Sequence, residues 1–179
     1  MRELRTIGHS THEAAAFVTL LRGAGIAAVA DVRRFPTSRR NPQFSREALA
    51  ATLEDAGIVY VHLPQLGGRR RARPGSPHGG WRVAGFRGYA DHMRTAEFAE
   101  GRAALEALAA ERLTAVMCAE AHWWRCHRRL IADVFAFAGW RVRHVMPDGR
   151  EVDHAPAPFA VPGEDGLPSY PPRGQAALL

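Results

Sequence analysis

The segment TAVMCAEAHWWRCHRRLI, residues 114–131, joins a strand-like run to a helical pattern through a loop that holds both cysteines of the chain. Its apolar start is typical of a strand buried on both faces and ends at Cys118. The pattern after about Trp124 predicts a helix that Gly139 ends. A further apolar strand, RVRHVM, follows at 141–146. This order predicts two parallel strands joined by a crossover helix.

The same alternation runs upstream of this segment. The strand of this segment is LTAVMC (113–118), and the other predicted strands before it are ELRTIG (3–8), IAAVADV (26–32) and IVYVHL (58–63). Helices are predicted after a cap at Ser10 or Thr11, after Ser45, and from GYADHM (88–93) to about Glu111, in one or two pieces with Thr95 as an internal cap. The pattern predicts an α/β fold: a three-layer sandwich with a mostly parallel sheet of about five strands and helices on both faces.

Length and composition predict one domain and one tail. A chain of 179 residues is large enough for a single buried core. We expect one α/β domain over residues 1–146. The chain from 147 to 179 is proline-rich and aperiodic, which favours an irregular or disordered tail.

The chain has no apolar run of about 18 residues, so no membrane association is expected. It opens with charged residues and a short strand rather than a signal peptide. Two cysteines are too few for a disulfide framework. We therefore expect a cytoplasmic protein whose thiols are reduced.

The cationic residues point to an anionic partner. The net charge is +6, and all 24 basic residues are arginine. Guanidinium groups bind phosphate and carboxylate through paired hydrogen bonds, so the expected partner is an anionic small molecule or a nucleic acid. The clustered arginines are Arg33, Arg34, Arg39 and Arg40; Arg69, Arg70, Arg71 and Arg73; and Arg125, Arg128 and Arg129.

Reactive side chains follow the predicted strands at their carboxyl ends, where open α/β sheets bind ligands. The candidate catalytic residues are His9, Cys118, Glu120, Cys126 and His127. The candidate substrate-binding residues are Ser10, Asp31, Arg33, Arg39, Arg40, Arg87, Tyr89, Trp124, Arg125 and Arg128. We expect His9, Asp31, Arg33 and the residues around the two cysteines to meet at one edge of the sheet.

Three chemistries fit these residues. The first turn of a helix and the neighbouring Arg125 and Arg128 would lower the pKa of Cys126 and favour a thiolate, although a packing role is the alternative. Cys118, Cys126 and His127 would instead suit zinc or iron. Glu120 and His9 would alternatively move protons without covalent catalysis.

Three functional hypotheses follow from these chemistries. An enzyme acting on a phosphate-bearing nucleotide or nucleic acid accounts for the strand-end residues and for Trp124 and Tyr89, which would stack on a base. A nucleic-acid-binding module without catalysis accounts for the charge. A metal- or redox-dependent protein accounts for Cys118 and for Cys126-His127.

Several motifs together resemble those of the domain-of-unknown-function-488 family. They are TIGHS (6–10), DVR (31–33), SRRNPQF (38–44), YVHLPQLGGRR (60–70), FRGYADHM (86–93), and CAE to CHRRLIA (118–132). The resemblance runs from about Thr6 to Val145 and implies a small cytoplasmic α/β protein with a shared polar site. Where the family usually has Asp-Pro-Trp between the two cysteines, this chain has His122 and Trp123 in place of Asp and Pro.

Overall fold

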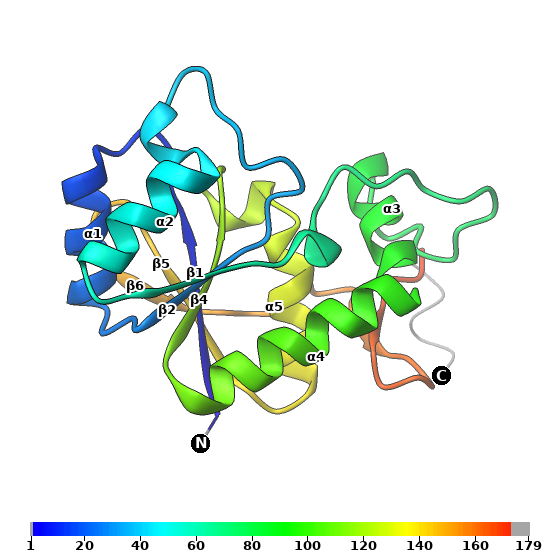
Figure 1. The fold of residues 1–179 in the computed structure, drawn as a ribbon. Helices are drawn as coiled ribbons and strands as arrows, with labels where there is room; N and C mark the ends of the chain where they lie inside the picture. Colours follow the sequence, from blue (N-terminus) through cyan, green and yellow to red (C-terminus); the bar gives the residue numbers. More distant parts are fainter. Residues whose placement is uncertain (1, 173–179) are drawn as a thin grey trace.

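The computed structural model describes residues 2–172, and its centre is a six-stranded sheet in the order β3-β2-β4-β1-β5-β6 (Figure 1). The sheet is parallel from β3 across to β5, and β6 pairs antiparallel with β5 at the edge. The strands are β1 (Glu3–Gly8), β2 (Ala28–Asp31), β3 (Val59–His62), β4 (Thr114–Cys118), β5 (Arg141–Val145) and β6 (Glu151–Asp153).

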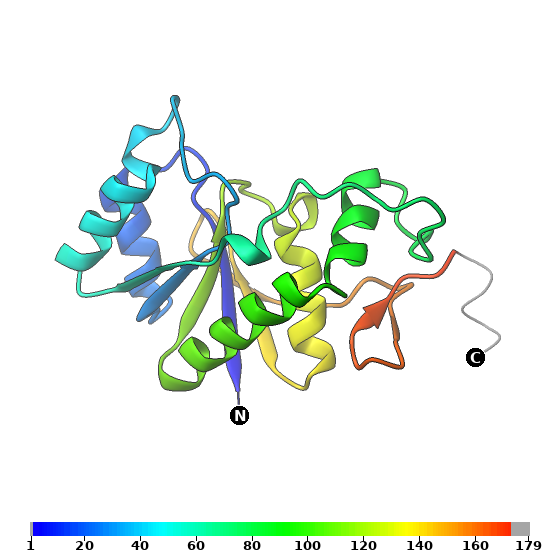
Figure 2. The same cartoon turned by 45° about the vertical axis from the view of Figure 1, so that its right-hand side comes forward.

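Helices cover both faces of this sheet, as the sequence predicts. Helices α1 (Ala14–Gly23) and α2 (Arg46–Asp55) pack on one face, and α4 (Ala96–Glu111) and α5 (Arg128–Phe137) pack on the other (Figures 1 and 2). Alternate residues of each strand therefore enter two separate apolar clusters. Val116 of β4 belongs to the α4/α5 cluster, whereas its neighbour Met117 belongs to the α1/α2 cluster.

The predicted α/β fold class is confirmed, and most element boundaries shift by only a few residues. The predicted helical stretch up to Glu111 is two helices, α3 (Ala84–His92) and α4, and Thr95 accepts a hydrogen bond from the Phe98 N–H as the cap of the second. The predicted cap of α1 is wrong, because α1 begins after Glu13 and Ser10 has a left-handed backbone with φ of 47°. Among the described helices, none is long and apolar enough to cross a membrane.

The helix after β4 starts later than the sequence predicts. A short 3-10 turn, η3 (Trp123–Arg125), takes up the residues where the helix was expected to begin. Cys126 follows in an extended conformation, and α5 begins at Arg128. Cys126 therefore precedes the helix instead of lying in its first turn. Its sulfur still accepts the Arg128 N–H, at 3.5 Å, so the N-terminus of α5 still faces the thiol.

The segment after Met146 contributes strands that the sequence does not predict. β6 extends the main sheet, and β7 (Val161–Pro162) and β8 (Pro168–Ser169) form a separate antiparallel pair. Each spans two or three residues, too few for a periodic pattern to be visible in the sequence. Tyr170 donates a hydrogen bond to Asp133 of α5 at 2.8 Å. Residues 173–179 of the predicted tail lie outside the described residues.

Strands β1 and β4 are neighbours, but their connections leave the sheet toward opposite faces. The chain leaves β1 toward α1, and it leaves β4 toward α5. The two loops remain joined across the sheet edge, because the His9 N–H donates to the Cys118 carbonyl at 2.9 Å and the Ser10 N–H donates to the Ala119 carbonyl at 3.0 Å. A crevice between such diverging loops is where open α/β sheets bind ligands.

Gly8 permits this close approach, since a Cβ atom there would overlap the Glu120 carbonyl group. We expect Gly8→Ala to lower the free energy of unfolding by about 1–3 kcal/mol, because the clash is with backbone atoms that cannot rotate away. Urea denaturation measures the change. Gly85→Ala is the matched control, since a Cβ there meets no atom within 4 Å. Equal stability of the two variants would contradict this account of Gly8.

Candidate functional site

A pocket of about 1030 Å³ opens at the carboxyl ends of β1, β2 and β4. Residues of the β1–α1 loop, the segment after β2 and the β4–α5 loop line it, together with Gly68, Arg69 and part of α3. Among the candidate residues, it brings together His9, Ser10, Arg33, Arg40, Cys118, Glu120, Trp124, Arg125, Cys126 and His127. Residues more than a hundred positions apart therefore share one hollow.

The pocket is lined by buried groups and by exposed ones. His9, Arg33, Cys118 and Cys126 are each less than 9% exposed. The exposed charged lining comes from four arginines and Glu120. The arginines are Arg34, Arg40, Arg69 and Arg125. Glu120 is the single acidic side chain among the described residues that line the pocket.

Arg33 is held rigidly by a buried ion pair. Its Nε and Nη2 donate to the two carboxylate oxygens of Asp31 at 2.9 and 2.6 Å. Tyr60 also donates to Asp31, at 2.8 Å, so this carboxylate is well satisfied. Asp31 does not line the pocket. It thus lies behind the site, where it orients Arg33 rather than meeting a ligand.

His9 is neutral and engaged at both ring nitrogens. Its Nδ1–H donates to the Ser10 carbonyl at 2.9 Å, which leaves Nε2 to accept from Arg33 Nη1 at 3.1 Å. Burial lowers the pKa of His9 to about 4, and the nearby Arg33 charge adds to this effect. The lone pair that a general base needs is therefore already bonded. This geometry argues against the expected role of His9 in moving protons.

The two cysteines are free thiols that face each other with different electrostatics. Burial raises the pKa of Cys118 well above the usual value, and the adjacent Cys126 raises it further. Burial also raises the pKa of Cys126, but the hydrogen bond from Cys118, the charge of Arg128 and the Arg128 N–H together lower it below the usual value. Cys126 is therefore the thiol that ionises first, with the Cys118 S–H as a donor to it.

The Arg128 side chain holds the β4–α5 loop in place around these two thiols. Its side chain is 1% exposed. Nη1 donates to Cys118 Sγ and to the Glu120 carbonyl, each at 2.6 Å, and Nη2 donates to the Ala121 carbonyl at 3.0 Å. The guanidinium does not line the pocket. Arg128 thus fixes the β4–α5 loop and places a positive charge behind both sulfurs.

His127 lies beside the ionisable thiol. Its Nδ1 is 3.6 Å from Cys126 Sγ, and its ring packs against Gly68, where a Cβ atom would come within 2.7 Å of Nδ1. Burial lowers the pKa of His127, so the ring is neutral at pH 7. A neutral imidazole beside a thiolate can accept or return a proton.

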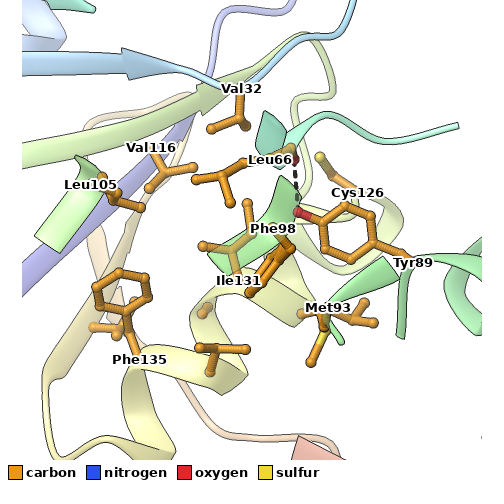
Figure 3. Packing of buried hydrophobic residues seen from close by; sticks show 14 of the residues in the cluster. Val32, Leu66, Tyr89, Met93, Phe98, Leu105, Val116, Cys126, Ile131 and Phe135 are labelled. Atoms are coloured by element: carbon orange, nitrogen blue, oxygen red, sulfur yellow. Dashed lines mark hydrogen bonds between the residues drawn. The ribbon is translucent and has the colours of Figure 1, made fainter. Parts of the chain in front are cut away.

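Besides Asp31 and Arg128, three more of the expected substrate-binding residues lie outside the pocket lining. Tyr89 is fully buried in the core, where its hydroxyl donates to the Leu66 carbonyl at 2.7 Å and its ring lies near Cys126 (Figure 3). Arg87 donates to the Trp81 and Arg82 carbonyls at 2.8 and 3.0 Å and so stabilises a loop. Arg39 is exposed and lies outside the pocket lining.

Some lining residues were not predicted as site residues. Phe35 and Val83 carry no chemical signal in the sequence, and only their exposure at the pocket identifies them. Arg34 and Arg69 belong to the arginine clusters, and this clustering in the sequence could have identified them as site residues. Arg70 of the same cluster is bound instead to Glu97 through two hydrogen bonds of 3.0 and 2.9 Å.

The donor set gives little support to a zinc or iron site. Within residues 2–172, no group of three or more His, Cys, Asp or Glu side chains is arranged to hold a metal ion. The Arg128 guanidinium donates to Cys118 Sγ and the Arg128 backbone N–H donates to Cys126 Sγ, so one arginine already contacts both sulfurs. Because the positively charged Arg128 already lies against Cys118 and Cys126, these residues do not fit a metal centre.

A comparison with models of known protein families matches most of the chain. The model of a family described as "Domain of unknown function DUF488" matches residues 13–135, which is more than half of the chain. The matched range includes the strand ends of β2 and β4 and both cysteines. No curated protein and no solved structure is significantly similar to the chain.

Proposed function

The chain belongs to the DUF488 family, and from the pocket that its motifs line we propose that it is an enzyme acting on a phosphate-bearing anionic substrate, with Cys126 as a thiolate nucleophile. One observation carries this proposal. Cys126 lines an arginine-rich pocket, and its sulfur is bordered by Cys118, His127 and the Arg128 N–H. Burying a negative charge costs free energy, so a buried thiol whose anion is stabilised by its neighbours is a candidate functional group.

The substrate's negative charge would meet the pocket arginines. No carboxylate of the described chain forms a salt bridge with Arg34, Arg40, Arg69 or Arg125. Their guanidinium forks are thus available to phosphate oxygens. Arg33 is different, because Asp31 already binds it, and it adds fixed positive potential beside His9.

Glu120 and His127 are the groups available for proton transfer. The Glu120 side chain is exposed at the pocket, and the His127 ring is adjacent to Cys126. In the reaction we propose, the Cys126 sulfur attacks an electrophilic centre such as phosphorus. The proton that Cys126 loses on ionising passes to His127 or Glu120. The bond to the leaving oxygen breaks, and that oxygen takes the electron pair together with this proton. Water or an acceptor hydroxyl then displaces the thiolate, so the enzyme would be a hydrolase or a transferase.

The ionisation of Cys126 is directly measurable. We expect iodoacetamide to alkylate Cys126 with a midpoint below the ordinary thiol pKa of about 8.5, because Cys118 and Arg128 stabilise the thiolate. Cys118 should resist alkylation up to higher pH. Trypsin cleaves after Arg125, which puts the two cysteines on different peptides for mass spectrometry. A Cys126 midpoint at or above about 8.5 would make it a packing residue.

Turnover tests the rest of the proposal. A panel of phosphate esters, assayed for release of phosphate or alcohol, should show activity that Cys126→Ser reduces by at least about 100-fold. Cys126→Ser is nearly isosteric, so circular dichroism should show an unchanged fold. Arg39→Gln is the matched control, since Arg39 is an exposed arginine of the same loop region but lies outside the pocket lining. Full activity of Cys126→Ser would exclude the nucleophile and leave Glu120 and His127 as the reactive groups.

A second candidate is a nucleic-acid-binding module without catalysis, which the four exposed and unpaired pocket arginines favour. Such binding would weaken steeply with salt and would not depend on Cys126. Binding of DNA or RNA that is equally strong in Cys126→Ser, together with no turnover of any ester, would favour this candidate.

A further inference from the structure

We propose that the pocket binds a nucleoside phosphate, with the base stacked on aromatic side chains and the phosphate held by arginines. This inference rests on the proposed anion-binding function and adds the base. It applies equally to a free nucleotide and to a nucleotide within a single strand, since both present the same two groups.

The exposed apolar side chains gather at this pocket. Four large hydrophobic residues of the described chain are strongly exposed, and three of them, Phe35, Val83 and Trp124, line it. Isolated exposed hydrophobic residues are common, but a concentration of them at one hollow marks a binding surface. The ligand should therefore have an apolar part as well as a negative charge.

The Trp124 indole is held in a position that suits stacking of a base on it. The His122 ring stacks on the indole with centroids 4.6 Å apart and planes inclined by 18°, which covers one face. Even so, 42% of Trp124 remains exposed. The edge contact with Trp123, at 5.7 Å and 87°, further restricts the indole. A flat ring held in this way can receive a base at a small entropic cost.

Phe35 offers a second aromatic surface on the segment after β2. It is 61% exposed, and the Arg34 guanidinium lies 5.6 Å from its ring centroid. An arginine beside an exposed aromatic ring places a phosphate-binding group and a base-stacking group on consecutive residues. A nucleoside phosphate has the same two groups joined by one sugar.

The size and charge of the pocket fit this ligand class. Its volume of about 1030 Å³ is at the upper end of the range for pockets that enclose a small ligand, about 300–1,000 Å³. An inorganic anion would leave most of it empty. A fatty-acyl phosphate would satisfy the charge, but flat aromatic rings recognise a planar base better than a flexible chain.

Calorimetry with matched ligands tests the inference. We expect AMP to bind at least about fivefold more tightly than ribose 5-phosphate, which has the same phosphate and sugar without the base. Trp124→Leu should remove this ratio while leaving the affinity for ribose 5-phosphate unchanged. Val152→Ala is the control, because Val152 is the remaining exposed hydrophobic residue and lies outside the pocket. A four-nucleotide single strand, compared with AMP, separates a polymeric ligand from a free nucleotide.

The outcomes separate this inference from the proposed function. Equal affinities for AMP and ribose 5-phosphate would overturn the base site but leave the anion site standing. An unchanged ratio in both Trp124→Leu and Phe35→Leu would also overturn it. Tighter binding of a fatty-acyl phosphate than of AMP would show that the exposed apolar side chains at the pocket bind a lipid chain instead of a base. Absence of binding by all these ligands would contradict both the base site and the anion site.

Discussion

Replacing Arg128 with methionine is expected to lower the free energy of unfolding by about 3–5 kcal/mol. The guanidinium is buried and donates to Cys118 and to the carbonyls of Glu120 and Ala121. Methionine fills much of the volume but donates no hydrogen bond, so the buried Cys118 sulfur and the two carbonyls lose their donor. Denaturant titration at pH 7 measures the change.

The same substitution should raise the pKa of Cys126, because it removes the positive charge behind the sulfur. The alkylation midpoint of Cys126 should then move upward, even if the variant retains its fold. Arg125→Met is the matched control. It removes the same charge three residues away, from an exposed side chain, and should change the stability by no more than about 0.5 kcal/mol. Equal stabilities of the two variants would show that Arg128 does not hold the loop.

Acidification is expected to destabilise the protein steeply between about pH 6.5 and pH 4. Burial lowers the pKa values of His9 and His78 to about 4, and that of His144 to about 2, from 6.5 in the unfolded chain. In this window the unfolded state binds protons at all three rings and the folded state does not. Their contribution to stability is complete above about pH 6.5 and is lost as the pH falls.

Each of these histidines should contribute about 1.4 kcal/mol per pH unit, so the three together should contribute about 4 kcal/mol per pH unit. They are at most 3% exposed, so solvent screens this effect little. Thermal melts at half-unit steps from pH 8 to pH 5 measure the slope. His144→Gln should make the slope shallower by about a third. A melting temperature that stays constant from pH 7 to pH 5 would contradict the neutral state of these rings.

The arrangement of the main sheet was predictable because it rests on regular patterns. Continuous apolar runs identified β2 and β4 as buried strands, and the strand-end rule then placed His9, Cys118 and Cys126 at one edge of the sheet. These inferences need only the period of a strand and the handedness of a crossover. Local periodicity is weaker in short elements, which is why β6 and the β7/β8 pair were missed.

The details of the site depend on partners that the sequence does not reveal. Tyr89 looks like a surface aromatic residue, but the Leu66 carbonyl satisfies its hydroxyl and allows full burial. His9 looks like a free base, but Arg33, which lies 24 positions along the chain and is oriented by Asp31, places a donor on its Nε2. Such roles follow from the tertiary contacts of each polar atom, and residue type alone does not determine them.

The use of arginine alone has a consequence for measurements at this pocket. Guanidinium groups keep their charge across the pH range in which proteins are usually studied, because they are much more basic than lysine amines. The cationic lining formed by Arg34, Arg40, Arg69 and Arg125 therefore supplies a constant positive charge to a ligand. A change in ligand affinity with pH reports the ionisation of the ligand or of the few titratable groups beside it. Binding isotherms collected across pH would therefore identify the charge state of the bound molecule before its structure is known.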